Sequence, residues 1–430
     1  PKQKKSPNVE IADKIARLST KGDPPMGNIP KNQVICKCLN ELHLNMNRFP
    51  ISDRYYKKLS TRAAIMLFVE GEIQQRKTLE DIRLHLLANE ELQQLTGISS
   101  IHSSTLNRKL EKMPLIYLQA LFEKLANRLM HLKRGGKGVQ KLGKLAPIDS
   151  TSLTLPFVFG DWAFYQDRTK GVKMHTRLLC LDDETPFPDR IVLSTVGVSD
   201  QMAVDQLITR KDLTYILDRG YVNYKRFTTW VKDGVLFVAR LKASNSYSVV
   251  KEHPIPEGTH ILRDAEVTVH DKKSKTHTPL RLVEFEDEKR RIYKVVTTRR
   301  DISAADVSEI YRCRWQIELF FKWIKQHLTT VTFHNYHPNA VWAQLYISVI
   351  SYLLCQLLHA QTPNKLSLFN FVRHLRLYSR HKWKCFVNEL KKPKMRTSKG
   401  RQKSENTQVL PRGTPGIGKN SRPVVKIIIS

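Results

Sequence analysis

The sequence predicts an α/β fold in which an all-helical N-terminal region precedes a core built on a β-sheet. Apolar residues recur at helical spacing over residues 51–132, and the spacing becomes strand-like after the basic, glycine-rich stretch 133–138. Short apolar runs then follow in the order β-β-β-α-β-α-β. A charged stretch at 242–291, rich in β-branched residues, interrupts this pattern and predicts a β insertion before the last strand and a long helix.

The N-terminal half begins with a basic arm that lacks periodic apolar positions, and we expect it to order only against a partner. In the helical region that follows, Thr78 and Asp81 have the spacing of a capping box before Ile82. One apolar stripe marks a further helix and comprises Leu118, Leu121, Phe122, Leu125, Leu129 and Leu132.

Residues 92–113 have the pattern of a helix-turn-helix, with a turn at Thr96-Gly97. In its second helix the core-facing positions are predicted to be Leu106, Leu110 and Met113. Four polar residues then remain for DNA phosphates or base edges, namely Asn107, Arg108, Lys109 and Lys112. An ordinary amphipathic helix with a solvated basic face explains the periodicity equally well, and only the charge of the whole chain favours DNA contact.

The core elements follow in sequence, each bounded by turn residues. Strands are predicted at 145–155, 175–181, 190–196, 213–217 and 235–241, with a helix at 224–232. After the insertion come a strand at 293–298, a long helix at 303–327 with Ser303 as N-cap, and a buried helix at 341–358. The predicted division has six segments. They are a basic arm (1–50), a DNA-binding helical region (51–140), the first segment of the core (141–241), the β insertion (242–292), the second segment of the core (293–375) and a basic tail (376–430).

Composition restricts the class of partner. The 430 residues are 41% apolar, enough to bury a core, and carry a net charge of +32 from 72 Lys and Arg against 40 Asp and Glu. Such an excess points to a polyanion, with nucleic acid the leading candidate. We expect no membrane span, because polar residues interrupt the best apolar stretch, 341–358. The six cysteines show no CxxC spacing, which disfavours a zinc ribbon or a disulfide framework and suggests a reducing cytosol.

Two aspartates stand where ligands bind in open α/β sheets. Asp149 lies near the end of its predicted strand, and Asp218 follows its strand immediately. Either residue alone has a simpler explanation, because aspartate side chains commonly begin turns.

The predicted long helix supplies a third carboxylate. Tyr311, Arg314, Glu318 and Lys325 follow one another at separations of three, four and seven residues. At about 100° per residue they fall within roughly a 60° sector, beside an apolar stripe that can pack on the sheet. That stripe comprises Ile310, Ile317, Phe321, Ile324 and Leu328. Ordinary salt bridges on a helix face would explain these four polar side chains, but they would not explain the two aspartates at strand ends.

Three converging carboxylates suit hard divalent cations such as Mg²⁺, which take oxygen ligands and are often shared with substrate phosphates. Two such ions about 3.5–4 Å apart can assist an in-line displacement at phosphorus. No protein nucleophile is then needed.

These residues resemble the DDE transposases of bacterial insertion sequences, in the group known for a Tyr-Arg-Glu-Lys signature and also called insertion-sequence-four transposases. The signature is matched by Tyr311, Arg314, Glu318 and Lys325, and the segment Asp218-Arg219-Gly220-Tyr221 resembles the family's second aspartate region. The resemblance covers roughly residues 145–330.

The resemblance implies a ribonuclease H-like catalytic core and cut-and-paste transposition. Asp149, Asp218 and Glu318 would hold two Mg²⁺ ions, which Mn²⁺ can replace. The terminal phosphate, in a hairpin step, would be held by Tyr311, Arg314 and Lys325, with Arg219 as a further DNA contact, and Trp230 or Trp315 are the candidate partners for a flipped base. The implied partners are double-stranded DNA, as terminal inverted repeats and target, and a second protomer on that DNA; the implied place is the nucleoid in the bacterial cytoplasm.

Three alternatives stay open. A DNA-binding relative without activity would keep the fold, and another ribonuclease H-like nuclease or resolvase would share the carboxylate chemistry. A scaffold or membrane-surface protein would explain the charge alone.

Overall fold

The computed structural model describes residues 33–44, 53, 58–133, 142–166, 169–181, 185–241, 247–255, 257–271, 276–327 and 333–392. Most of the predicted arm and tail, nearly all of the glycine-rich stretch 133–138, and Leu328 lie outside these residues. Where the predicted arm and tail are described, they are largely helical. Helix α2 (Val34–Asn40) buries five apolar side chains, and its first amides bond to backbone carbonyls just before α14 (Trp383–Lys391).

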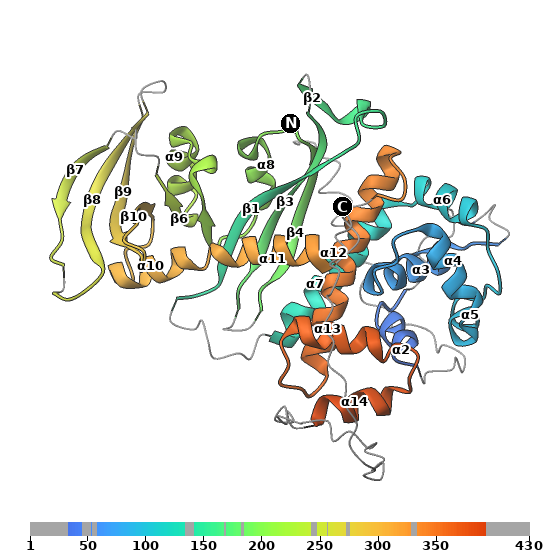
Figure 1. Ribbon diagram of the computed structural model, residues 1–430. Coiled ribbons are helices and arrows are strands. Elements are labelled where there is room, and N and C mark those ends of the chain that lie inside the picture. Colours follow the sequence, from blue (N-terminus) through green and yellow to red (C-terminus); the bar gives the residue numbers. More distant parts are fainter. Residues whose placement is uncertain are drawn as a thin grey trace, which may run out of the picture. The chain divides into compact units, whose positions relative to one another are not determined.

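The N-terminal region is helical, as predicted (Figure 1). After α2 its helices are α3 (Thr61–Ile73), α4 (Leu79–Leu87), α5 (Glu90–Thr96), α6 (Ser103–Glu111) and α7 (Leu115–Lys133). The capping box of Thr78 and Asp81 is confirmed at the start of α4, and Gly97 ends α5 with a left-handed φ of 71°. The predicted stripe of α7 is buried except for Leu132, which is 46% exposed, so that position was predicted wrongly.

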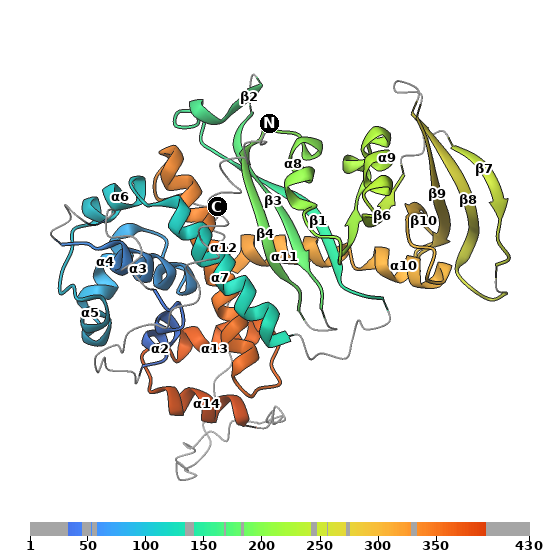
Figure 2. The same cartoon turned by 180° about the vertical axis from the view of Figure 1, so that it is seen from behind.

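Helix α12 (Pro338–Gln361) is the buried helix expected at 341–358. Among the described residues it is the one helix long and apolar enough to cross a membrane, but most of its apolar surface is buried in the protein. It packs against α3 and α7 on one side and against the sheet strand β4 on another, and α13 (Leu368–Leu377) follows it. The N-terminal helices and the sheet therefore share α12 as a common packing partner (Figures 1 and 2).

The sheet begins with the strand order expected of a ribonuclease H-like core. Its first strands are β1 (Leu145–Thr154), β2 (Phe164–Gln166), β3 (Thr169–Leu179), β4 (Phe187–Thr195), β5 (Thr214–Leu217) and β6 (Leu236–Arg240). β3 pairs antiparallel with β1 and β4, whereas β1, β5 and β6 run parallel. The helices α8 (Asp200–Leu207) and α9 (Tyr224–Lys232) complete the predicted β-β-β-α-β-α-β order, to which the short β2 is an addition.

The stretch predicted as a β insertion forms β7 (Tyr247–Glu252), β8 (Ile261–Asp271) and β9 (Thr276–Glu286), and β10 (Ile292–Thr297) follows. These strands extend the core sheet rather than forming a separate one. β10 pairs antiparallel with β6, placing Val295 opposite Arg240, and the sheet continues through β9 and β8 to β7. Helix α9 packs on β8 and β9, and α10 (Ala304–Arg312) contacts the same strands.

The long helix expected at 303–327 is two helices, which corrects that prediction. α10 ends at Arg312, and α11 (Trp315–His327) begins after a turn at Cys313 and Arg314. The predicted N-cap is confirmed, because Ser303 and Asp306 form a capping box. At the junction the amides of Arg314, Gln316 and Ile317 bond to carbonyls three residues earlier, at 3.0–3.2 Å. This tightened, 3₁₀-type turn interrupts the α-helix.

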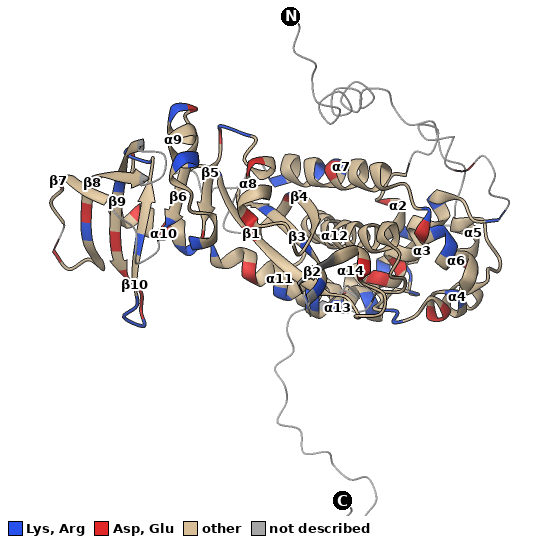
Figure 3. Ribbon diagram, turned by 90° about the horizontal axis from the view of Figure 1, so that it is seen from above, with Lys and Arg blue, Asp and Glu red and all other residues tan. Residues whose placement is uncertain are grey.

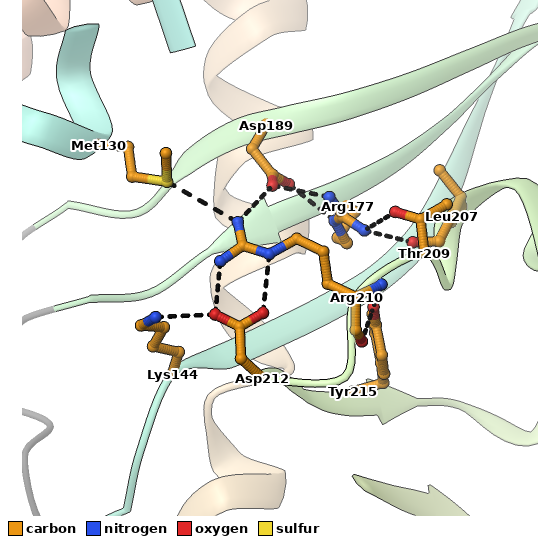
Figure 4. Close-up of polar contacts among 9 residues, drawn as sticks. All are labelled: Met130, Lys144, Arg177, Asp189, Leu207, Thr209, Arg210, Asp212 and Tyr215. Atoms are coloured by element: carbon orange, nitrogen blue, oxygen red, sulfur yellow. Dashed lines mark hydrogen bonds and ion pairs between the residues drawn. The ribbon is translucent and has the colours of Figure 1, made fainter. Parts of the chain in front are cut away.

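A network of charged side chains ties the central strands together on the side of the sheet near α7 (Figure 4). The guanidinium of Arg177 on β3 donates two hydrogen bonds of 2.8 Å to Asp189 on β4, and it also donates to the carbonyl of Leu207. Arg210 pairs with Asp212, which also accepts from Lys144 just before β1. The segment leading into β5 is thereby fixed against β1, β3 and β4.

Candidate active site

Asp149 and Asp218 lie side by side where the parallel pairing of β1 with β5 ends. The register pairs Ile148 of β1 with Leu217 of β5, so the next residue of each strand is one of the two aspartates. Asp149 is in the middle of β1 rather than near its end, because β1 continues to Thr154; it is the pairing with β5 that stops there. Each carboxylate accepts a hydrogen bond of 2.8 Å from the next backbone amide along the chain.

Around the turn between α10 and α11, Tyr311 and Arg314 contact Asp218, and Arg314 also pairs with Glu318. The Tyr311 hydroxyl donates to Asp218 Oδ1 at 3.4 Å. Arg314 Nη1 lies 2.6 Å from Glu318 Oε1 and 3.9 Å from Asp218 Oδ2. The guanidinium therefore stands between the second aspartate and the glutamate, and α11 itself packs against β1.

Two further predicted residues have exposed side chains. Lys325 is exposed on α11, seven residues after Glu318, and Arg219 is exposed directly after Asp218. Of the two tryptophans considered for base stacking, Trp230 is 5% exposed and packs on Phe227 and Phe237. Trp315, directly after Arg314 in the chain, is 56% exposed, so of the two it is the one with an accessible side chain.

Burial raises the pKa of Asp149 to about 6, against a lowering by the Ser150 amide and Arg314 and with further raising by Asp218 and Asp200. A carboxylate that is costly to ionise in the folded state needs a positive partner at neutral pH. The arrangement thus favours binding of a cation beside Asp149.

We expect Asp149→Asn to stabilise the metal-free protein at pH 7.5 by about 1–3 kcal/mol. Because the pKa of Asp149 is raised from 3.8 to about 6, ionising this side chain costs the folded protein stability, and the cost grows as pH rises through this range. The gain should shrink as pH falls to 4.5. Asp200→Asn is the control of opposite sign, since the pKa of Asp200 is lowered to about 2 and its ionised form stabilises the fold above the unfolded pKa. Urea unfolding in EDTA at both pH values measures each change, and a destabilised Asp149→Asn would contradict the expectation.

Sequence reasoning missed two charged residues beside the cluster. Asp200, the first residue of α8, accepts from the Ser150 hydroxyl at 2.7 Å and lies 3.4 Å from His175 Nδ1 and 3.5 Å from Lys173 Nζ. Although burial opposes it, hydrogen bonds from His175 and Ser150 lower its pKa. Arg240 ends β6, with Nη1 3.9 Å from Asp218 Oδ1. Arg240 could have been predicted, because the neighbouring parallel strands β5 and β6 end at the same end of the sheet.

The second helix of the predicted helix-turn-helix presents only some of its expected polar face. Leu106, Leu110 and Met113 are buried as predicted, and Arg108 and Lys112 are exposed. Lys109 was predicted wrongly to face outward: it is 2% exposed, and its Nζ lies 2.8 Å from Asp53 Oδ1. Its position three residues after Leu106 puts it on the buried stripe.

Asn107, the fourth residue of that face, accepts a hydrogen bond of 2.8 Å from Asn335 Nδ2. Asn335 also donates to Glu111 Oε1 at 2.7 Å, so one side of α6 is joined to the segment before α12. Asn107 is thus engaged within the protein, and Arg108 and Lys112 are the residues of this face that lie open to a partner.

The carboxylates provide oxygen donors of the kind that hard divalent cations take. Within the described stretches of the chain, no set of three His, Cys, Asp or Glu side chains is already arranged around one point. The side-by-side pair of Asp149 and Asp218 is sufficient for a cation that completes its shell with water and substrate phosphate, and the raised pKa of Asp149 favours such a cation. The residues present therefore fit a divalent ion.

The sheet order and the clustered carboxylates point to a DNA-processing enzyme of the ribonuclease H-like class. Residues 141–354 match the family described as the transposase DDE domain, and the chain belongs to this family of insertion-sequence transposases.

Among its relatives is a transposase of insertion sequence element IS5377 from Geobacillus stearothermophilus, 29% identical over 297 residues, which are 65% of this chain and 74% of the relative. The transposase y4zB of Sinorhizobium fredii is 30% identical over 252 residues, 57% of this chain and 68% of its own. A transposase of element IS4SA from Synechocystis is 32% identical over 77 residues, 18% of this chain and 23% of its own.

Proposed function

We propose that this transposase moves its insertion sequence by a cut-and-paste reaction. A phosphodiester at each element end is hydrolysed, and the freed 3′-OH then attacks a target duplex. The observation that carries the proposal is the meeting of Asp149 and Asp218 at one sheet edge with Tyr311, Arg314 and Glu318. The spacing of the last three with Lys325 supports membership in the Tyr-Arg-Glu-Lys group.

In this proposal Asp149, Asp218 and Glu318 hold two Mg²⁺ ions, which Mn²⁺ can replace. When bound, the ions activate the attacking oxygen and stabilise the leaving oxygen of the displacement. The protein orients the DNA around them. The Arg314 guanidinium, 14% exposed and already among the carboxylates, offers a planar pair of donors to a phosphate. Tyr311 adds a hydroxyl donor, Lys325 a point charge further along α11, and Arg219 a charge beside Asp218.

The proposed substrates are double-stranded terminal inverted repeats and a target duplex, brought together by a homodimer on DNA in the bacterial cytoplasm, at the nucleoid. Joining two element ends needs two active sites, and a dimer supplies them. Arg108 on α6 and Lys112 just after that helix are the proposed contacts of the N-terminal region. Light scattering on the complex with paired ends tests the dimer, and a mass of one protomer would contradict it.

The deciding experiment is cleavage of a labelled duplex that carries the element's own ends, with Mg²⁺ or with EDTA. Cleavage that needs the metal, followed by joining of the 3′-OH to a second duplex, is the expected result. Cleavage without joining would indicate a nuclease or resolvase. Binding without cleavage would indicate a relative that keeps the fold but has lost its activity.

We also expect affinity for generic DNA to fall steeply with salt, because each phosphate contact releases counterions. Figure 3 shows Lys and Arg positions both on the N-terminal helices and on the sheet. Six or more phosphate contacts would lower the affinity about a thousandfold between roughly 50 and 200 mM salt. Fluorescence anisotropy over this range measures the slope, and a flat response would contradict the electrostatic argument.

A further inference from the structure

The loop between β1 and β2 exposes three consecutive large apolar side chains. Phe157 is 62% exposed, Val158 77% and Phe159 57%. Single exposed apolar residues are common on protein surfaces, but a contiguous group at a loop tip usually marks a contact site. We call residues 156–160 the aromatic loop.

Several contacts tie this loop to β3. Lys170 of β3, whose side chain is 6% exposed, donates a hydrogen bond of 2.6 Å from Nζ to the Phe157 carbonyl and pairs with Asp161. The same ammonium lies 3.8 Å from the centre of the Phe157 ring. At Gly160 a side chain would come within 2.9 Å of Lys170 Cβ, so the loop packs closely there. The buried ammonium group of Lys170 therefore packs against the apolar residues of this loop.

The aromatic loop is joined to α6 through the segment before α12. The Phe159 ring stacks on Tyr336, with centroids 5.2 Å apart and planes 3° from parallel, and Trp162 Nε1 donates to the Tyr336 carbonyl at 3.0 Å. The neighbouring Asn335 bonds to Asn107 and Glu111 of α6. Figures 1 and 2 show α6 and the loop beside β2 at the same end of α12. The apolar tip is thus linked to α6 through this segment, and Arg108 within that helix and Lys112 just after it have exposed side chains.

We propose that the aromatic loop is a wedge that enters a base step of duplex DNA while Arg108 and Lys112 hold the adjacent phosphates. The inference rests on DNA being the substrate in the proposed function. Apolar side chains that enter the stack unstack and kink DNA, and flanking cations supply the affinity. A net charge of +32 favours a duplex over a second, equally basic copy of the chain as the occupant. Asp161, the acidic neighbour of the loop, is matched by Lys170.

The aromatic loop follows β1, the strand that carries Asp149. From Asp149 the strand continues five residues to Thr154, which at about 3.3 Å per residue is about 17 Å, or the length of about five base pairs. Distortion is therefore expected several base pairs from the bond facing Asp149, and not at that bond.

The test uses the full-length protein, in EDTA, with duplexes that carry 2-aminopurine at successive positions. The wild type should raise the fluorescence at one step several base pairs from the element end, where the base is unstacked. The double variant Phe157→Ser, Val158→Ser should lose this signal while the salt slope of binding stays unchanged. Met202→Ser, which alters another exposed apolar residue at 67% exposure, should keep the signal. So should the conservative variant Phe157→Leu.

The double variant Arg108→Gln, Lys112→Gln should lower the salt slope by up to about 0.9 per residue. Thermal unfolding first establishes that every variant is folded. A folded Phe157→Ser, Val158→Ser variant that still unstacks the base would overturn the proposal. The proposal would also be overturned if light scattering showed that the Phe157→Ser, Val158→Ser variant has lost a protomer, because the loop would then be a contact between two copies of the chain. If the base is unstacked but the DNA is never cleaved, the proposed function is contradicted and the wedge is not. If the DNA is cleaved without unstacking, the wedge is contradicted and the proposed function is not.

Discussion

Glu318→Gln is expected to lower the rate of cleavage at the element end by on the order of a thousandfold or more, while binding of the same duplex persists. Glutamine keeps the volume of the side chain and an oxygen that can accept from Arg314 Nη1, now 2.6 Å from Glu318 Oε1. It removes the negative charge, and with it the cation ligand that the proposed function assigns to this position. Single-turnover cleavage with Mg²⁺ measures the loss, and anisotropy with the uncut duplex measures binding.

Glu309→Gln is the matched control for this substitution. Glu309 lies on the neighbouring helix α10, is 53% exposed and pairs with Arg312 at 2.9 Å, so it offers the same chemical change outside the cluster. Cleavage should stay within about twofold of the wild type, as expected for an exposed ion pair. Equal losses in the two variants would show that a general change of charge, and not the place of Glu318, governs activity.

Asp189→Ala is expected to lower the free energy of unfolding by about 3–5 kcal/mol, the usual cost of removing one partner of a buried ion pair. The side chains of Arg177 and Asp189 are 4% and 10% exposed, and without the carboxylate the guanidinium keeps only neutral acceptors such as the Leu207 carbonyl. Urea unfolding at pH 7.5 measures the change.

Asp212→Ala, in the same network, gives the comparison (Figure 4). Its carboxylate binds both Arg210 and Lys144, but it is 47% exposed, so solvent screens the pairs and about 0–1 kcal/mol should be lost. A loss at Asp212 as large as that at Asp189 would show that the number of ion pairs, and not their burial, determines the stability of this network.

Much of the cluster could be predicted because it depends on local rules. An aspartate at the end of a short apolar run lies at a sheet edge, and two such runs that pair in parallel bring their aspartates together. Capping boxes at Thr78 and Ser303 likewise follow from side chains three residues apart.

What could not be predicted depends on tertiary contacts. The turn at Cys313 and Arg314 contains neither proline nor glycine, so nothing in the sequence shows that the helix is interrupted there. A lysine at position 109 is expected on the surface. It is buried because it pairs with Asp53, 56 residues earlier in the chain, and the sequence alone does not show this contact. Asp200 stands at an ordinary helix start, and only the pairing of β1 with β3 and the packing of α8 on the sheet bring it to Ser150 and His175.

The joining of β7 to β10 with the core sheet has a consequence for how the enzyme matures on the ribosome. Glu318 is synthesised 100 residues after Asp218, and the strands that extend the sheet are translated between them. At about 5–20 residues per second the two aspartates exist for about 5–20 s before the glutamate does. Helix α12, which packs against both α7 and β4, comes later still. On the nascent chain the two aspartates are therefore present for seconds before the glutamate and α12 can join them.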